Sequence, residues 1–310
     1  MTQQSNEAHL LTIADGVHAW IGARGDSNAG AIETPDGLII VDTQQYQRLG
    51  RAFRDAALAK TGQPLRTVVY THCHLDHTAG SSVFADAPVI AHEKTLTAMN
   101  SSLGVRVGDS WSITDFATKL RLLFGHNILE LVPEGDPARA WFKARIGTSD
   151  YDRVVIRPPS ETFADSFAFH LPDDTVHLRY FGPAHCDGDI IVYLEKRKVA
   201  FLADLLFQNR FPWLGDCDLD GLIAALGHVL ALDVTVVVPG HGPPATLADV
   251  ARFREMLIDL RAAVARAVKN GVSEDAAARE IELPQYAQLQ RYKEWKPHDV
   301  RATYRYLQGK

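Results

Sequence analysis

The chain is poor in several kinds of residue, and each shortage excludes a class of protein. It has 310 residues but only three cysteines, Cys73, Cys186 and Cys217, an odd number that is too small for a disulfide framework. No apolar run approaches the roughly 20 residues of a membrane-spanning helix. Residues 1–9 lack the cationic and apolar regions of a signal peptide. We therefore expect no membrane association and a cytoplasmic location.

Positive charge is also scarce. The 32 lysines and arginines are outnumbered by 38 aspartates and glutamates, which gives a formal net charge of −6. A nucleic-acid groove needs clustered basic side chains, so we expect a small-molecule substrate and no nucleic-acid partner. The chain is 46% hydrophobic and 23% charged. This composition is typical of a globular protein with one large α/β domain or two smaller ones.

Short apolar runs between turns predict two groups of strands, each followed by helices. The first group is expected at 10–13, 17–21, 30–34, 38–41, 67–70 and 88–92, with helices at 46–60 and 93–103. The second group is expected at 163–171, 176–181, 190–194, 199–202 and 234–238, with helices at 219–230 and 252–269 and a short helix capped by Ser273. This order predicts an α/β fold, a four-layer αββα sandwich of two mixed β-sheets flanked by helices.

Residues from about 105 to 160 interrupt the pattern, although 138–146 has helical character. We interpret the chain, 1–310, as a single domain with this insertion and a C-terminal helical segment at about 246–310. The insertion could cover a site or form a dimer contact, and the C-terminal helices could support a dimer, so a homodimer is one expectation. Five aromatic residues could line a pocket, although such residues more often belong to a core: Trp111, Phe124, Trp141, Phe211 and Trp213.

The densest cluster of metal-binding side chains is the stretch Thr71-His72-Cys73-His74-Leu75-Asp76-His77. It follows the strand-like run 66–70, and alternation along a strand would point His72, His74 and Asp76 to one side. A helix that begins near Asp76 would turn His77 toward the same cavity. Four such polar groups beside a buried strand are costly without a metal ion.

Three further candidate ligands follow strand-like runs in the second half of the chain. They are His185 after 176–181, Asp204 at the end of 199–204 and His241 after 234–238. Strand ends and the loops that follow them are common positions for active-site residues. Together the candidates comprise five histidines and two aspartates, enough for two metal ions with mixed nitrogen and oxygen ligands. This donor set suits zinc best, and iron, manganese or cobalt are alternatives.

Other residues near these motifs have weaker signals. Asp42 ends the buried run 38–41, and it could orient a ligand histidine or simply cap a turn. Asn28 could reach the mouth of the site and polarise a substrate. Strand alternation would turn Cys73 and Cys186 away from the metals, which predicts a packing role for both.

The order and context of these motifs resemble the metallo-beta-lactamase superfamily of binuclear metallohydrolases. The resemblance covers residues from about 10 to 245. Its motifs are the run 31–43, the histidine stretch at 71–80, and the segments 182–189, 203–207 and 239–243.

The resemblance implies a role for each of the seven candidate ligands. His72, His74 and His185 would hold the first metal ion. Asp76, His77 and His241 would hold the second, and Asp204 would bridge the two. A hydroxide between the metals would be the nucleophile, and Asp76 could orient it and pass its proton to the leaving group.

Two residues differ from the ligands of particular branches of the superfamily, and these differences indicate which activities to expect. Asp204 stands where the best-known zinc beta-lactamases have a cysteine ligand, which is more similar to the thioesterase, lactonase and general hydrolase branches. His74 stands where the flavodiiron branch has a glutamate, which disfavours a redox diiron site. We therefore expect a binuclear zinc hydrolase of an ester, thioester, lactone or amide, beta-lactams included. The alternatives are a mononuclear iron persulfide dioxygenase and a non-catalytic metal-binding protein.

Overall fold

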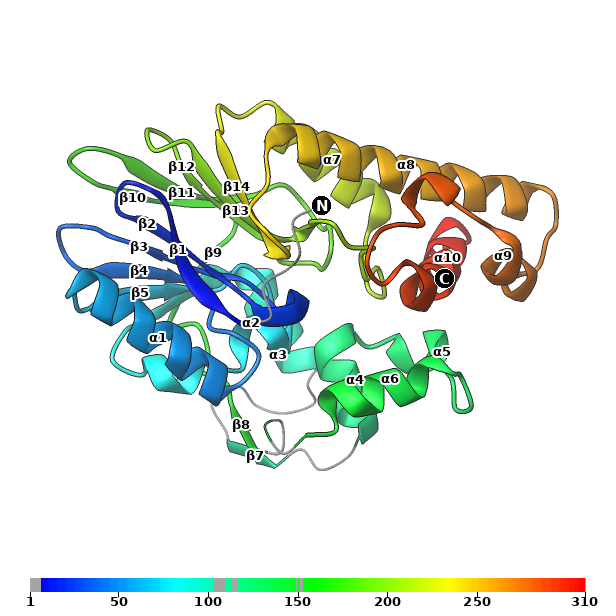
Figure 1. Cartoon of the computed structure of the whole chain (residues 1–310), viewed down its shortest axis with the longest axis horizontal. Helices are drawn as coiled ribbons and strands as arrows, with labels where there is room; N and C mark the ends of the chain where they lie inside the picture. Colours follow the sequence, from blue (N-terminus) through cyan, green and yellow to red (C-terminus); the bar gives the residue numbers. More distant parts are fainter. Residues whose placement is uncertain (1–6, 103–109, 113–115, 149, 151–152, 310) are drawn as a thin grey trace.

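Two β-sheets stack face to face, and helices cover their outer sides (Figure 1). The structure is a computed structural model that describes residues 7–102, 110–112, 116–148, 150 and 153–309. The first sheet has the strand order β1-β2-β3-β4-β5-β6-β9, and the second has the order β10-β11-β12-β13-β14. Both sheets mix parallel and antiparallel pairs. The αββα sandwich predicted from the sequence is therefore confirmed.

The strands of the first sheet are β1 (His9–Ala14), β2 (Val17–Ile21), β3 (Ala29–Ile32), β4 (Leu38–Val41), β5 (Leu65–Val69), β6 (Val89–His92) and β9 (Glu161–Phe163). Those of the second are β10 (Ser166–His170), β11 (Thr175–Tyr180), β12 (Ile190–Leu194), β13 (Val199–Phe207) and β14 (Val236–His241). A separate ladder joins β7 (Ser110–Ser112) to β8 (Arg153–Val155).

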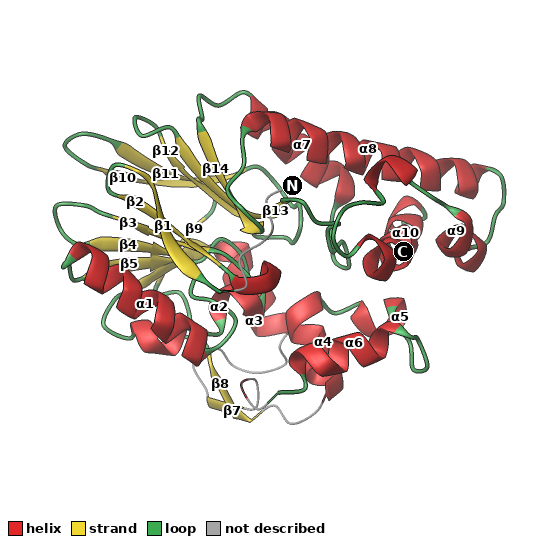
Figure 2. Cartoon of the chain, in the orientation of Figure 1, coloured by secondary structure: helices red, strands yellow, loops and turns green. Residues whose placement is uncertain are grey.

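Helices flank the sheets and extend beyond them (Figure 2). Those in the first half are α1 (Gln47–Thr61), α2 (Leu75–Thr78) and α3 (Glu93–Ser102), followed by α4 (Phe116–Phe124), α5 (Ile128–Leu131) and α6 (Ala138–Ile146) in the insertion. Those in the second half are α7 (Leu219–Leu230), α8 (Leu247–Lys269), α9 (Glu274–Glu280) and α10 (Tyr292–Leu307). Among the described residues, no helix is both long and apolar enough to cross a membrane.

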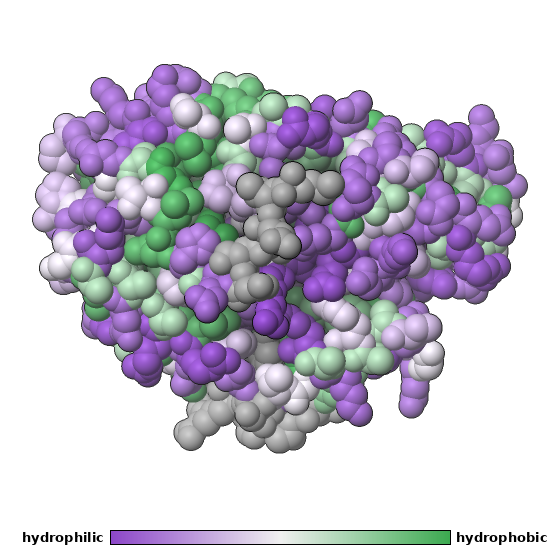
Figure 3. Space-filling model, in the orientation of Figure 1, coloured by the Kyte–Doolittle hydropathy of each residue, from purple (hydrophilic) through white to green (hydrophobic). Residues whose placement is uncertain are grey.

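Apolar side chains from both sheets meet in the space between them. Ile39 and Val69 from the first sheet belong to the same buried cluster as Val192 and Phe201 from the second. This is the usual core of two stacked sheets, because each strand directs alternate side chains inward. The face shown in Figure 3 is mostly hydrophilic, apart from an apolar band over its strand-rich half.

The single strand expected at 163–171 is wrong, because this segment forms two strands in different sheets. β9 pairs with β6 in the first sheet, and β10 pairs with β11 in the second. Phe163, Phe167 and Phe169 all contact the cluster between the sheets, and their rings follow one another at 6.1 and 5.1 Å. The apolar pattern thus continues through the point where the chain passes from the first sheet to the second. For this reason the sequence alone does not indicate two separate strands.

Parallel pairing brings several strand ends to one edge of the sandwich. β4, β5 and β6 run parallel in the first sheet, and β13 and β14 run parallel in the second. Side chains that follow parallel strands therefore collect at the carboxyl ends, where ligands bind in open α/β sheets. Asp42 and the histidine stretch follow two of these strands, and His241 is the last residue of a third.

Candidate metal centre

The histidine stretch adopts a loop and a helical turn rather than a continued strand. β5 ends at Val69, and α2 begins at Leu75. The expectation that strand alternation aligns His72, His74 and Asp76 is therefore wrong. Just beyond the end of β5, Asp42 Oδ1 accepts a hydrogen bond of 2.8 Å from the Thr71 amide. All three histidines of the stretch are buried.

A bulge in β13 turns Asp204 toward the same edge. The register of β13 against β14 shifts around Ala203, which has a φ of 45°, in the left-handed region. Bulges of this kind redirect a side chain next to active sites. A Cβ atom at Gly240 would overlap Asp204 Oδ1, so only glycine leaves room for this carboxylate. His185 reaches the site from the loop between β11 and β12.

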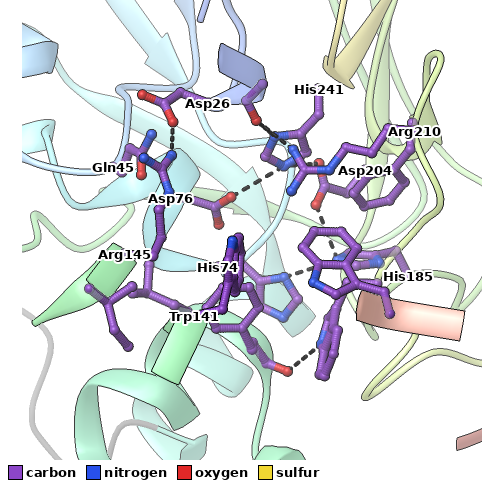
Figure 4. Close-up of a pocket in the computed structure, with 17 residues that line it drawn as sticks. Asp26, Gln45, His74, Asp76, Trp141, Arg145, His185, Asp204, Arg210 and His241 are labelled. Atoms are coloured by element: carbon purple, nitrogen blue, oxygen red, sulfur yellow. Dashed lines mark hydrogen bonds and ion pairs between the residues drawn. The ribbon is translucent and has the colours of Figure 1, made fainter. Parts of the chain in front are cut away.

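The seven predicted ligands converge in two groups. His72, His74, His185 and Asp204 form one group, and Asp76, His77, Asp204 and His241 form the other, with the ligand atoms of each within 4.8 Å of one another. The grouping is the one that the resemblance implied. Figure 4 shows His74, Asp76, His185, Asp204 and His241 converging from separate segments on the floor of one pocket.

Asp204 belongs to both groups through different oxygen atoms. Its Oδ1 lies 3.1 Å from His77 Nε2 and 3.4 Å from His241 Nε2. Its Oδ2 lies 3.3 Å from His185 Nε2. A carboxylate with one oxygen directed to each group is suited to bridge two cations.

Two histidines of the first group, His72 and His185, are in the form that binds metal. Burial lowers the pKa of His72 well below its usual value and that of His185 to about 4, so both imidazoles are neutral at pH 7. His72 Nε2 is buried and has no hydrogen-bond partner within the described part of the chain. An unpaired buried nitrogen that faces other ligand atoms fits a metal ion.

The carboxylates of the site are ionised. Burial would raise the pKa of Asp204, but His241 and His77 outweigh it and hold that pKa well below its usual value. The pKa of Asp76 is also lowered, because His77 and His241 outweigh the effect of burial. Ionised carboxylates together with the neutral imidazoles of His72 and His185 are suitable donors for divalent cations, zinc among them.

Asp42 holds two of the candidate ligands in place. His77 Nδ1 donates to Asp42 Oδ2 at 2.9 Å, which leaves Nε2 directed into the site. The Thr71 hydroxyl lies 2.7 Å from Asp42 Oδ2 and 3.0 Å from His72 Nδ1. Such outer contacts set the tautomer and orientation of ligand histidines. The position of Asp42 agrees with the ligand-orienting role and not with a simple turn cap.

One other expectation is wrong, and a second holds for a different reason. Asn28 does not face a substrate, because its Nδ2 donates to the carbonyls of Pro239 and Gly242, both at 2.8 Å. It therefore braces the segment that carries His241. Cys73 and Cys186 face each other with sulfur atoms 3.9 Å apart. Cys186 is buried, Cys73 packs against the apolar core, and neither belongs to a group of candidate ligands. The expected packing role therefore agrees with the structure, although neither residue lies in a strand and alternation is not its cause.

The pocket above the carboxylates is built largely by segments outside the metal motifs. Its lining includes Phe124 from α4, Trp141 and Arg145 from α6, Arg210 and Trp213 from the segment after β13, and Trp295 from α10. Phe211 packs instead on Tyr292, with ring centroids 5.2 Å apart, and the side chain of Trp111 lies outside the described residues. Arg145, Arg210 and Trp295 have no sequence signal, because only tertiary packing brings them here.

The amino-acid sequence identifies the family to which the chain belongs. The family model of the metallo-beta-lactamase superfamily matches residues 22–241. The chain belongs to this superfamily. The match contains all seven candidate ligands and excludes α8, α9 and α10 entirely, so Trp295 of the pocket wall lies beyond the family core.

Among curated proteins, the chain is similar to enzymes with two different named activities. It is 23% identical over 290 residues to a linear primary-alkylsulfatase of Pseudomonas sp. (strain ATCC 19151), which covers 88% of this chain and 54% of the relative. It is 26% identical over 247 residues to the alpha subunit of a 2,4-dinitroanisole O-demethylase of Nocardioides sp. (strain JS1661), which covers 78% of this chain and 57% of the relative. The chain thus spans about half the length of these relatives.

Solved structures share the fold at low identity. The inverting sec-alkylsulfatase Pisa1 from Pseudomonas sp. matches 96% of this chain and 50% of its own, with a TM-score of 0.70 and 18% identity. A metallo-beta-lactamase from Pontibacter korlensis matches 81% of this chain and 98% of its own, with a TM-score of 0.56 and 18% identity.

Proposed function

We propose that this protein is a hydrolase that uses two metal ions to cleave an ester, thioester, lactone or amide bond. Zinc is the metal that we expect at both positions. The observation that carries the proposal is the position of Asp204, with one oxygen toward each ligand group. Two cations held there would lower the pKa of water to roughly 7 and polarise the bond under attack. The alkylsulfatase relative extends the ester class to sulfate esters.

Asp76 is the residue of the centre best placed to move a proton. Its side chain is 17% exposed, whereas that of Asp204 is 5% exposed, and both line the pocket. His241 Nε2 lies 3.3 Å from Asp76 Oδ2 and holds the carboxylate at the pocket floor. Asp76 would take a proton from the attacking water and deliver it to the leaving group, as a general acid–base does.

The test is metal content together with hydrolysis. The purified protein should contain about two metal ions per chain, as a two-metal centre requires, and should cleave at least one member of a panel of lactones, thioesters, carboxylate and sulfate esters, and beta-lactams. Asp204→Ala should lose both the second ion and hydrolysis. Asp233→Ala is the matched control, because Asp233 is exposed and its carboxylate pairs with the exposed Lys198 at 2.9 Å.

Three results would count against the proposal. Full hydrolysis by metal-free protein would exclude a metal mechanism. One iron per chain, with oxygen uptake on a persulfide, would instead indicate the dioxygenase alternative. Two bound ions without hydrolysis of any panel member would favour a non-catalytic metal-binding protein.

A further inference from the structure

Arg210 is a buried cation whose charge no ion pair neutralises within the described chain. Its side chain lines the pocket, and the residue is only 8% exposed. One guanidinium nitrogen donates to the Gly25 carbonyl, while Nε has no hydrogen-bond partner among the described residues. Burial of a guanidinium is costly when its donors are unsatisfied. The unpaired donor therefore points to a ligand that accepts hydrogen bonds.

Two neighbouring arginines differ from Arg210 in this respect. Arg145 forms an ion pair with Asp26, and Arg291 pairs with Glu294 at 3.5 Å. Burial lowers the pKa of Arg210 to about 9, with Arg291 and Arg145 adding to the effect, so the group is still protonated at pH 7. Arg210 is thus the one of these three arginines whose positive charge lacks a carboxylate partner.

The carboxylates that favour the charged form of Arg210 belong to the candidate metal centre. Asp204 and Asp76 both favour the charged form of Arg210, but cations bound at the centre would neutralise these two carboxylates. Two divalent cations carry more charge than two aspartates remove, so the floor of the loaded pocket would be positive. Figure 4 shows Arg210 reaching into the pocket on the side of Asp204 and His241.

An aromatic wall stands beside this positive floor. Trp295 lies 6.0 Å from Trp141 and 5.9 Å from Trp213 between ring centroids, in edge-to-face arrangements. The Arg210 guanidinium stacks on the Trp295 ring at 4.3 Å. Trp213 Nε1 donates to the Phe124 carbonyl at 2.7 Å, so this indole already has its hydrogen bond. Trp213 and Trp295 are buried, at 4% and 1% exposure, so the partly buried Trp141 is the ring of this wall that a ligand can pack against.

We propose that the substrate is a small organic anion with an aromatic or alkyl body, that Arg210 binds its negative group, and that the body packs on Trp141. The proposal rests on the proposed function in one respect, that this pocket is the substrate site. Carboxylate and sulfate share the chemistry that a guanidinium recognises, since both present several oxygen acceptors. Arg210 is accordingly a specificity-determining residue.

The test measures binding of uncleavable probes to the metal-loaded protein by calorimetry at pH 7. The probes are 2-naphthoate, naphthalene-2-sulfonate and the neutral 2-naphthol, which share one ring system. Both anions should bind at least about tenfold more tightly than 2-naphthol, because a hydrogen bond to a charged group is worth about that much. The stronger of the two anions identifies the carboxylate or the sulfonate as the better ligand.

Arg210→Met should weaken binding of the anions by about 10- to 100-fold and leave 2-naphthol binding unchanged. Arg54→Met is the matched control and should change neither, because Arg54 lies on α1 and pairs with Asp86 at 2.7 Å. Metal content and melting temperature, measured on every variant, separate loss of the arginine contact from loss of the metal centre or the fold.

Equal affinity for all three probes, or unchanged anion binding in folded, metal-loaded Arg210→Met, would overturn the proposal. If Arg210→Met does not fold, Arg210→Lys decides the matter. A lysine lacks the planar, forked donor group of arginine, so anion affinity should fall several-fold. Unchanged anion affinity in this variant would contradict the proposal. Anion binding without hydrolysis would refute only the proposed function, whereas hydrolysis without a preference for anions would refute only this inference.

Discussion

At the scale of single residues, Asp42 links the fold to the candidate metal centre. It has a φ of 59°, so the chain turns sharply at the end of β4. Its carboxylate accepts from the Thr71 amide and contacts the Thr71 hydroxyl and His77 Nδ1, all within 2.9 Å. A short carboxylate at this position therefore serves both the backbone and a ligand histidine.

Asp42→Asn should weaken metal binding with little change in shape. An amide nitrogen directed at His77 Nδ1 would favour the wrong tautomer, and loss of such an outer contact typically costs about 10- to 100-fold in metal affinity. Competition with a chromogenic zinc chelator measures the affinity. Asp55→Asn, at an exposed position of α1, is the control. Equal zinc affinity in the Asp42 variant and the wild-type protein would show that Asp42 does not orient His77.

At the scale of elements, the C-terminal helices hold the segment that forms one pocket wall. The Phe211 amide donates to the Gln290 carbonyl at 2.7 Å, and the Leu214 amide donates to Asp299 at 2.9 Å. Because Arg210 and Trp213 lie in the same segment, α10 controls where these side chains point. The α4–α5 corner is tied to it as well, since the His126 amide donates to Asp216 at 2.7 Å.

The pair of His126 and Asp216 in this corner should make a pH-dependent contribution to the stability of the fold. The hydrogen bond that His126 donates to the Asp216 carboxylate raises the pKa of His126 above 6.5. Burial would raise the pKa of Asp216, but the contacts with His126 outweigh it and lower that pKa below 3.8. The His126 contribution is complete below pH 6.5 and is lost as pH rises through the raised pKa. The Asp216 contribution is present above pH 3.8 and is lost as pH falls through the lowered pKa.

The pair should therefore stabilise the fold most between about pH 4 and 6.5. Its size should be at most about 0.5 kcal/mol, because the His126 side chain is 65% exposed and solvent screens it. The measurement is the difference in unfolding free energy between the wild-type protein and His126→Gln across pH 4 to 8. A difference that stays constant over this range would contradict an ionic contribution.

At the scale of the whole molecule, the candidate centre joins the two halves of the sandwich. His72, His74, Asp76 and His77 come from the first half, whereas His185, Asp204 and His241 come from the second. Bound cations would thus link both sheets at one edge. Asn28 adds a neutral link, because it lies before β3 and bonds to carbonyls around His241.

Metal removal should consequently lower the melting temperature. A ligand held at about 1,000 times its dissociation constant stabilises by roughly 4 kcal/mol, which corresponds to about 6 °C for a chain of this size. Thermal unfolding with and without dipicolinate, followed by readdition of zinc, measures the shift. Asp204→Ala should respond much less to the chelator, and an unchanged wild-type melting temperature would contradict metal linkage of the halves.

The sequence by itself determined the local elements and the kind of chemistry. Periodicity located α6 and α7 at Ala138–Ile146 and Leu219–Leu230, and the side chain of Ser273 caps α9 by accepting from the Ala276 amide. The order of histidines and aspartates indicated the superfamily. These features depend on residue type and short spacing, and both can be read along the chain.

Only the tertiary structure decided how the site is completed. It split 163–171 between two sheets, turned Asp204 through a bulge, and placed Arg210 and Trp295 beside residues more than 50 positions away in the sequence. Such contacts join segments with no local relation, and burial depends on neighbours that the sequence does not name. The ligand types were therefore predictable from the chain alone, whereas the walls of the pocket followed from packing.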